Sequence, residues 1–280
     1  LFAIYSLLAR AYNNGKEIGT MHEPTAPIGV FDSGLGGASV LREALRLLPD
    51  ENYIYYGDNA NAPYGDRPEN EITELTLHCV HELLEMGCKA ILVACNTATA
   101  NCIDIIRTDL NVPVVSVEPA IRPACQQPGK GKVLMMATLA TTRLERYLAL
   151  QQRMPEPDRV VNIPCPGIVE RIEAGRLGDA DFDDLFDAFL APYDGLEVDG
   201  IVLGCTHYVF IPGAFQRAAA RHLTGPCLLF DGNEGTIHQL ARVLEEHGMR
   251  NPHGSAAVEF HTSGDPAHYR PLFENLLSRP

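Results

Sequence analysis

The chain has 280 residues, of which 46% are hydrophobic, and this is enough for one large or two modest domains. Lysine and arginine number 22 against 36 aspartates and glutamates, so the net charge is −14. This balance excludes a general nucleic-acid binder, because phosphate contacts need a basic surface, whereas backbone N–H groups can still bind a small anion. No apolar stretch approaches the roughly 20 residues that span a bilayer, so we expect a soluble protein with no membrane partner.

Eight cysteines in a chain of this length are too dilute for a disulfide scaffold. They form no Cys-x-x-Cys pair, which disfavours a structural zinc site, and we expect no metal. Most of them lie in apolar or helical surroundings and are expected to be buried and reduced. Free thiols are typical of a reducing compartment, which predicts a cytoplasmic protein.

Residues 1–26 form an N-terminal extension that differs in pattern from the rest of the chain. Its apolar beginning lacks a preceding basic region and a small-residue cleavage site, so a signal peptide is disfavoured. A short amphipathic helix, a regulatory extension, and residues upstream of a true start at Met21 all remain open.

Beyond Pro27, short apolar runs alternate with segments of helical periodicity. The apolar runs are continuous, as in strands that are buried on both faces. This alternation is typical of an α/β protein with a parallel sheet. In chain order, the pattern predicts strand 28–31, helix 38–48, strand 53–56, helix 69–86, strand 90–94, helix 97–107, strand 112–117, strand 132–137, helix 142–153, strand 160–163, helices 166–174 and 182–190, strand 200–203, helix 212–222, strand 227–230, helix 235–247 and strand 258–262.

Segments 89–97 and 199–207 align with each other without a gap. Each has a buried-type strand, a small residue, a cysteine (Cys95 or Cys205) and then a polar residue that can cap a helix. They are either two similar strand–helix junctions that arose by chance or two half-sites related by pseudo-symmetry. In the second case both thiols lie at carboxyl ends of strands, where open α/β sheets bind ligands.

A thiol at the start of a helix has a pKa below its ordinary value of ~8.5, because the helix dipole favours the thiolate. Two such thiols on facing half-sites can remove a proton from one face of a carbon and return one to the other face. A Cys205–His207 hydrolase is the competing interpretation. It is disfavoured because residues i and i+2 across a strand-to-helix turn are poorly placed for a nucleophile–base hydrogen bond.

Two loops come directly after strands and offer further site residues. Segment 32–37 is Asp-Ser-Gly-Leu-Gly-Gly, which lacks the lysine of a Walker A motif and the full G-x-G-x-x-G spacing. Either Asp32 or Ser33 caps a helix there, or the turn brings backbone N–H groups to a carboxylate. The polar loop 59–65 also comes after a strand, although Tyr64 taken alone indicates surface packing.

From residue 28 to about residue 277, the chain resembles the cofactor-independent glutamate racemases of bacterial cell-wall synthesis. The order and spacing of the matching motifs are specific as a set, although each alone is modest evidence. They are GVFDSGLGG at 29–37, YYGD at 55–58 with PYG at 63–65, ACNTA at 94–98, Cys165-Pro166 with Glu173, GCTHY at 204–208 and FDG at 230–232.

This resemblance implies an α/β fold of two similar domains with mainly parallel sheets and an active site in the cleft between them. The first domain would hold residues 27–117 and 229–280, and the second would hold residues 118–228. The activity implied is interconversion of L- and D-glutamate without a cofactor, which supplies D-glutamate for peptidoglycan synthesis. A homodimer and a peptidoglycan-precursor activator are further partners that the resemblance suggests.

By the same resemblance, Cys95 would take the α-proton from D-glutamate and Cys205 from L-glutamate. Asp32 and His207 would assist the thiols, and Glu173 would support His207, with Glu170 one turn earlier as its alternative. The substrate would be held by Asp32, Ser33, Tyr64, Gly65, Asn96, Thr97, Thr206 and His207.

Three other functions compete with this one. An aspartate racemase would keep both thiols and change the pocket for the side-chain carboxylate. A decarboxylase of the wider superfamily would keep one thiol, and a non-catalytic binding protein such as a topoisomerase inhibitor would need neither. The presence of both Cys95 and Cys205 in matching contexts argues against the last two.

Overall fold

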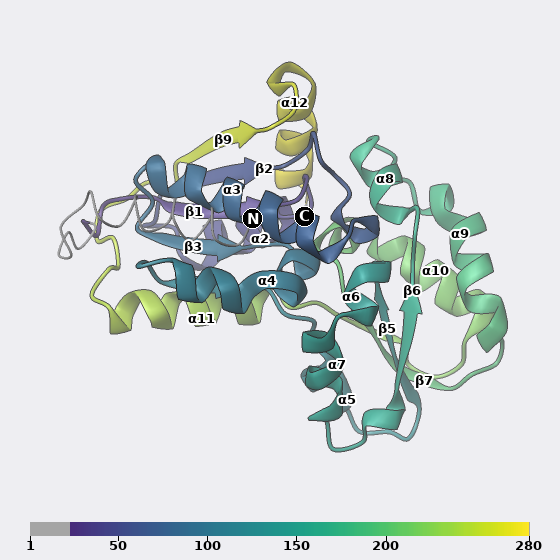
Figure 1. Ribbon diagram of the computed structural model, residues 1–280. Helices are drawn as coiled ribbons and strands as arrows, with labels where there is room; N and C mark the ends of the chain where they lie inside the picture. The colour runs from purple at the N-terminus through teal and green to yellow at the C-terminus, as the bar shows by residue number, and fades with distance from the viewer. Residues whose placement is uncertain (1–22, 280) are drawn as a thin grey trace.

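The computed structural model describes residues 23–279, which form two lobes joined side by side (Figure 1). Each lobe is built on its own sheet, with strand orders β4-β3-β1-β2-β9 and β6-β5-β7-β8. Neighbouring strands in both sheets are parallel. The predicted α/β class with parallel sheets is confirmed.

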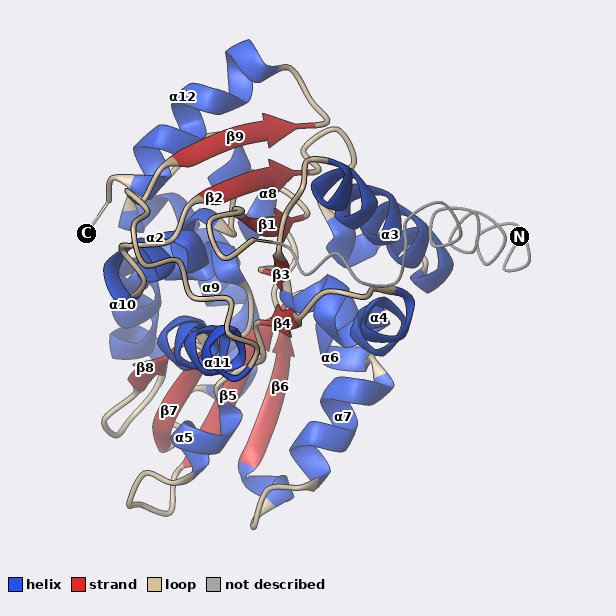
Figure 2. Cartoon of the chain, turned by 90° about the vertical axis from the view of Figure 1, so that its left-hand side faces the viewer, coloured by secondary structure: helices blue, strands red, loops and turns tan. Residues whose placement is uncertain are grey.

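The first lobe contains the five-stranded sheet with helices on both faces (Figure 2). Alternation along β1 explains the layers, since Val30 packs with α2, α11 and α12 while Phe31 packs with α3 and α4. Its elements are β1 (Ile28–Asp32), α2 (Ala38–Leu47), β2 (Tyr53–Gly57), α3 (Glu69–Glu85), β3 (Ala90–Val93), α4 (Asn96–Asp109), β4 (Val114–Ser116), α11 (Asn233–Glu246), β9 (Val258–Thr262) and α12 (Pro266–Leu277).

The second lobe contains the four-stranded sheet. Met135 on β5 packs on the face with α5 and α7, and Met136 packs on the face with α8, α9 and α10. Its elements are α5 (Ile121–Cys125), β5 (Lys132–Ala137), α6 (Leu139–Arg143), α7 (Glu145–Gln152), β6 (Val160–Pro164), α8 (Ile168–Glu173), α9 (Asp183–Leu190), β7 (Val198–Leu203), the 3-10 helix η5 (Thr206–Phe210), α10 (Pro212–His222) and β8 (Leu228–Phe230). The first lobe has its own 3-10 helix, η1 (Tyr64–Asp66), in the loop after β2.

The chain passes between the lobes twice, and the two crossings lie against each other. A Cβ atom on Gly232 would collide with the carbonyl oxygen of Glu118, so only glycine allows this approach. After the second crossing, α11 packs on α2 of the first lobe. The domain division at 117/118 and 228/229 stays a prediction, and strand β8 spans its second boundary.

Two local predictions differ from the structure, and two helices, α5 and α12, were not predicted. The helix expected over 142–153 is divided into α6 and α7 at Leu144, whose backbone is extended. The polar residue after Cys205 was expected to cap a helix, but a short 3-10 helix follows Cys205. The helix predicted over 212–222 is confirmed as α10. Helix α12 was not predicted, since Pro271 within it obscures the helical pattern.

The N-terminal extension lies largely outside the described residues, which begin at Glu23. Within residues 23–279, no helix combines the length and the apolar character needed to cross a membrane. The eight cysteines are all free thiols, as predicted.

Candidate active site

Strand ends from both lobes meet around one small cavity of about 10 Å³. The cavity holds both predicted thiols and every predicted substrate-binding residue, and also three residues that sequence reasoning missed. Its lining comprises Asp32, Ser33, Pro63, Tyr64, Gly65, Cys95, Asn96, Thr97, Thr138, Val169, Cys205, Thr206 and His207. Thr138 comes after β5 as Ser33 comes after β1, so the strand-end rule applied to 132–137 could have found it.

Cys95 lies directly after β3 and caps α4. Its Sγ accepts a hydrogen bond from the backbone N–H of Ala98 at 3.5 Å and donates to Ser33 Oγ at 3.4 Å. Burial, and secondarily the charge of Asp32, raises the pKa of the Cys95 thiol to about 12. The expectation that the helix dipole lowers this pKa is wrong, because desolvation of the thiolate outweighs the dipole and the two hydrogen bonds. At neutral pH, Cys95 is a neutral thiol.

Cys205 comes after β7 and belongs to a chain of hydrogen bonds. Its Sγ lies 3.6 Å from His207 Nδ1, and His207 Nε2 lies 2.6 Å from Glu173 Oε1. The predicted poor placement of Cys205 against His207 is therefore wrong, because the chain turns into a 3-10 helix immediately after an extended Cys205. Glu170 is exposed, whereas Glu173 reaches the histidine, so the structure separates the two carboxylates.

The protonation of His207 is determined by its partners. Burial lowers the pKa of the imidazole, but hydrogen bonds to Cys205 and Glu173 and their negative charges outweigh burial and hold the pKa well above its ordinary value. The imidazolium lies directly beside the Sγ atom of Cys205. The two thiols thus lie in different electrostatic surroundings, one beside a cation and one beside the buried carboxylate Asp32.

Two buried oxygens in the site lack hydrogen-bond donors among residues 23–279, namely Asp32 Oδ1 and Asn96 Oδ1. The second oxygen of Asp32 accepts from the backbone N–H of Gly34 at 3.0 Å. Burial raises the pKa of Asp32 above its ordinary value, although the charge of His207 opposes this. Buried acceptors are normally paired, so these two oxygens are suited to a ligand that donates hydrogen bonds.

Tyr64 and Gly65 line the cavity from the loop after β2. The Tyr64 hydroxyl donates to Asp58 Oδ2 at 2.5 Å, so it is used within the loop. Gly65 lies against Thr138 of the second lobe, where a Cβ would approach the threonine within 2.9 Å. The ring and backbone of this loop, and not the tyrosine hydroxyl, are left to face a ligand.

Hydroxyl groups from both lobes meet beside the cavity. Thr97 Oγ1 lies 3.0 Å from Thr138 Oγ1 and 3.3 Å from Thr141 Oγ1. Thr138 and Thr141 are themselves 2.9 Å apart. Such hydroxyls can turn their hydrogens toward a carboxylate without adding a charge.

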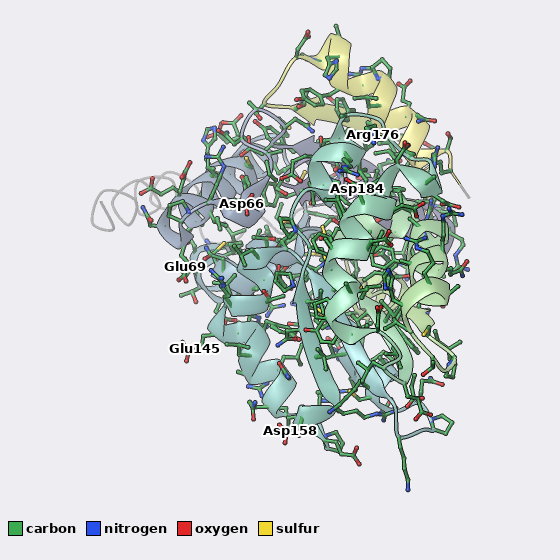
Figure 3. All side chains as sticks on the ribbon, turned by 90° about the vertical axis from the view of Figure 1, so that its right-hand side faces the viewer. Asp66, Glu69, Glu145, Asp158, Arg176 and Asp184 are labelled. Carbon is green, nitrogen blue, oxygen red and sulfur yellow. The ribbon has the colours of Figure 1, made fainter. Side chains whose placement is uncertain are left out.

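A larger cavity of about 610 Å³ lies where α4 meets α7, and it contains neither Cys95 nor Cys205. Side chains of both charges line it, among them Arg146, Glu69 and Glu145. Glu69 and Glu145 are labelled on the left-hand side of Figure 3. Arg146 on α7 pairs there with Asp104 at 2.8 Å. Its lining lacks the paired thiols, so the chemistry is assigned to the smaller cavity. Throughout 23–279, no cluster of three or more His, Cys, Asp or Glu residues could hold a metal ion.

Fold and site together define a two-domain α/β protein with paired thiols between its lobes. The chain belongs to the Asp/Glu/hydantoin racemase family, whose model matches residues 28–240. The glutamate racemase of Clostridium perfringens is 44% identical over 227 residues, which cover 81% of this chain and 86% of that protein.

Solved structures agree with this assignment. Glutamate racemase from Thermus thermophilus, in complex with beta-chloro-D-alanine, superposes with a TM-score of 0.75 at 36% identity, covering 92% of this chain and 94% of that one. Escherichia coli glutamate racemase, in complex with L-glutamate and the activator UDP-MurNAc-ala, gives a TM-score of 0.75 at 29% identity, covering 90% and 95%. The resemblance stated from the sequence motifs is confirmed.

Proposed function

We propose that the protein is a glutamate racemase that interconverts L- and D-glutamate with Cys95 and Cys205 as its two acid/bases. The observation that carries the proposal is the pair of thiols that end β3 and β7 in different lobes and line one cavity. Racemisation at a carbon that carries an acidic proton needs a base on one face and an acid on the other. Relatives named glutamate racemase support the choice of substrate.

The reaction from L-glutamate begins at Cys205. Acting as the base beside His207, Cys205 takes the α-proton of L-glutamate and is left as a thiol. The electron pair left on the α-carbon is delocalised into the adjacent carboxyl group, and Cys95 gives its own proton to the opposite face. D-glutamate leaves, and Cys95 remains as a thiolate beside a protonated Cys205. The reverse reaction begins from that second state.

The polar groups of glutamate match the donors and acceptors that line the site. The ammonium group would donate to Asp32 Oδ1 and Asn96 Oδ1, which lack donors in the described chain. The carboxylates would accept from the hydroxyls of Thr97, Thr138 and Thr206, and from backbone N–H groups at the helix starts. A cavity of about 10 Å³ has room for about one water molecule, so the lobes must separate to admit glutamate.

The same proposal assigns a cellular role. The proposed reaction needs neither pyridoxal phosphate nor a metal. Its product, D-glutamate, would be used for peptidoglycan synthesis in the cytoplasm. A peptidoglycan-precursor activator is part of the proposal, supported by the UDP-MurNAc-ala complex of the E. coli relative. A homodimer stays a prediction.

Purified protein with L- or D-glutamate, followed by circular dichroism without added cofactor, tests the function. We expect both enantiomers to reach an equal mixture, with and without a chelator. Faster turnover of aspartate would assign the protein to the neighbouring branch of the family. Activity that appears only with pyridoxal phosphate, or that dialysis against chelator removes, would contradict the mechanism.

A further inference from the structure

Asn59 is a buried amide in the loop after β2, and its side chain contacts the other lobe. It is 5% exposed, and its Nδ2 donates to Glu173 Oε2 at 3.1 Å. Glu173 is the last residue of α8, 114 residues later in the chain. The amide therefore links the two lobes through Glu173, the carboxylate that is also hydrogen-bonded to His207.

Thr262, at the end of β9, determines which way this amide faces. Its hydroxyl lies 2.7 Å from Asn59 Oδ1 and accepts a hydrogen bond from the backbone N–H of Gly264 at 3.1 Å. The hydroxyl donates its single hydrogen to Asn59 Oδ1, and the carboxylate of Glu173 can only accept, so both partners favour the same orientation of the amide. The N–H groups of Asn59 are consequently left to face Glu173.

Three donors then hold the Glu173 carboxylate. Oε2 accepts from Asn59, while Oε1 accepts from His207 Nε2 and from the backbone N–H of Leu35, each at 2.6 Å. With Nε2 bound in this way, the imidazole presents Nδ1 to the Cys205 thiol. Supporting hydrogen bonds of this kind fix the orientation of a reacting side chain.

We infer that Asn59 is a positioning residue for Cys205. Its amide orients Glu173, Glu173 orients His207, and His207 holds the sulfur atom of Cys205 where it can reach the α-carbon. The inference rests on the proposed racemase function and deepens it. It also predicts asymmetry, because the chain of contacts ends at Cys205, whereas Cys95 contacts Ser33 and Ala98.

Primary isotope effects can detect this asymmetry. Replacing Asn59 removes its hydrogen bond to Glu173 and should slow the proton transfer that Cys205 performs. This transfer then determines more of the overall rate. The isotope effect for α-deuterated substrate should then rise for the enantiomer that Cys205 deprotonates and fall for the other. That enantiomer is identified independently as the one whose α-proton still exchanges in Cys95→Ala.

The experiment compares wild type with Asn59→Leu, Thr262→Val and Thr262→Ser. For Asn59→Leu, we expect kcat/KM to fall on the order of 10- to 100-fold, since small displacements of catalytic groups have effects of this size. Its two isotope effects should move apart. Thr262→Val should shift them the same way by less, and Thr262→Ser should behave as wild type because it keeps the hydroxyl. If Asn59→Leu does not fold, the two Thr262 variants carry the test.

A purely structural role for these residues would give a different pattern. Lost packing would harm Thr262→Ser at least as much as Thr262→Val, and it would leave the two isotope effects in their wild-type ratio. Asn61→Leu is the matched control, since Asn61 lies in the same loop but donates to Asp58 at 2.9 Å. We expect its isotope effects to keep the wild-type ratio. An unchanged ratio in Asn59→Leu overturns the inference.

A readout without turnover separates this inference from the proposed function. The Nε2 proton of His207, hydrogen-bonded to Glu173, should be resolved by NMR in wild type and should exchange faster with solvent in Asn59→Leu. An unchanged exchange rate contradicts the positioning role. A faster rate in a protein that does not racemise glutamate supports positioning and rejects the proposed function.

Discussion

Gly36 and His207 lie so close together across the lobe interface that a Cβ atom on Gly36 would be nearer to Nδ1 of the histidine than real Cβ contacts allow. The glycine belongs to the loop after β1, and the histidine belongs to the 3-10 helix after β7. The same Cβ would also collide with Thr206 Oγ1. The missing side chain at Gly36 therefore leaves the space that His207 occupies beside Cys205.

Gly36→Ala should displace His207 from Cys205. We expect a loss of glutamate turnover on the order of 10²-fold, since a shift of about 1 Å has effects of this size. The free energy of unfolding should fall by about 1–3 kcal/mol through overpacking. Steady-state kinetics and urea unfolding measure the two effects.

Gly235→Ala is the matched control for this variant. Gly235 lies in the first turn of α11 and is exposed, and a Cβ atom added there would have nothing within 4 Å. Alanine at this position should leave turnover unchanged and should not destabilise the fold. Equal turnover by both variants would show that the Gly36 contact does not matter to the reaction.

Removing one thiol should leave a base that acts on one enantiomer only. In heavy water, Cys95→Ala should exchange the α-proton of L-glutamate slowly through Cys205 without forming D-glutamate. Cys205→Ala should show the mirror preference. Both should lose racemisation by several orders of magnitude, and the double variant should lose little more, because groups that act as a unit are strongly non-additive.

Deuterium incorporation read by NMR for each enantiomer tests this assignment. Equal exchange into both enantiomers by a single variant would contradict the division of faces between the thiols. Near-normal racemisation by either variant would contradict the two-base mechanism.

The pKa of Cys95 predicts a dependence of stability on pH. Burial raises this pKa from an ordinary value near 9.0 to about 12, so the folded protein favours the neutral thiol. That contribution is fully present below pH 9.0 and is lost as the pH rises toward 12, because the unfolded chain ionises first. The loss amounts to about 1.4 kcal/mol per pH unit in this window. Cys95→Ala should therefore lose stability less steeply in urea titrations above pH 9, and an identical slope would refute the assignment.

The stability of an N-terminally truncated chain should depend on whether the truncation keeps a hydrogen-bond acceptor for Lys89. The side chains of Lys89 and Glu51 are fully buried, and Lys89 Nζ lies 2.6 Å from Glu51 Oε2. Lys89 Nζ also donates to the carbonyl oxygen of Pro24. A chain that starts at Met21 keeps that acceptor, so it should retain turnover and unfold within about 0.5 kcal/mol of the full chain. A chain that starts at Ala26 lacks it and should lose about 1–3 kcal/mol in urea unfolding. Equal stability of the two truncations would show that Pro24 contributes nothing.

Local sequence patterns predicted the strands well, because the residues that make a strand apolar are adjacent in the sequence. Buried parallel strands need continuous apolar residues, and these are visible at 28–31 and 90–94. The internal alignment of 89–97 with 199–207 singled out Cys95 and Cys205, and the rule that ligands bind at the carboxyl ends of strands made them candidate site residues. The motif resemblance supplied Glu173, which no periodicity indicates.

Contacts between distant segments were beyond the reach of such patterns. Asn59, Glu173 and Thr262 meet only because β9 returns beside β2 and α8 faces the loop after β2. The error over the pKa of Cys95 has the same origin, since the burial of this thiol depends on segments that are distant in the chain and pack around it. A sequence shows which residues start a helix but not how much water reaches them.

Strand β2 is bonded on one side to β1 and on the other to β9, which comes from the far end of the chain. During synthesis on the ribosome, the sheet of the first lobe therefore cannot be completed until β9 has been made. The sheet of the second lobe is complete once Phe230 has emerged. Assembly can thus run against the usual order in which N-terminal domains fold first. A nascent fragment that ends before Val258 exposes an open β2 edge to neighbouring chains, where it can pair and aggregate.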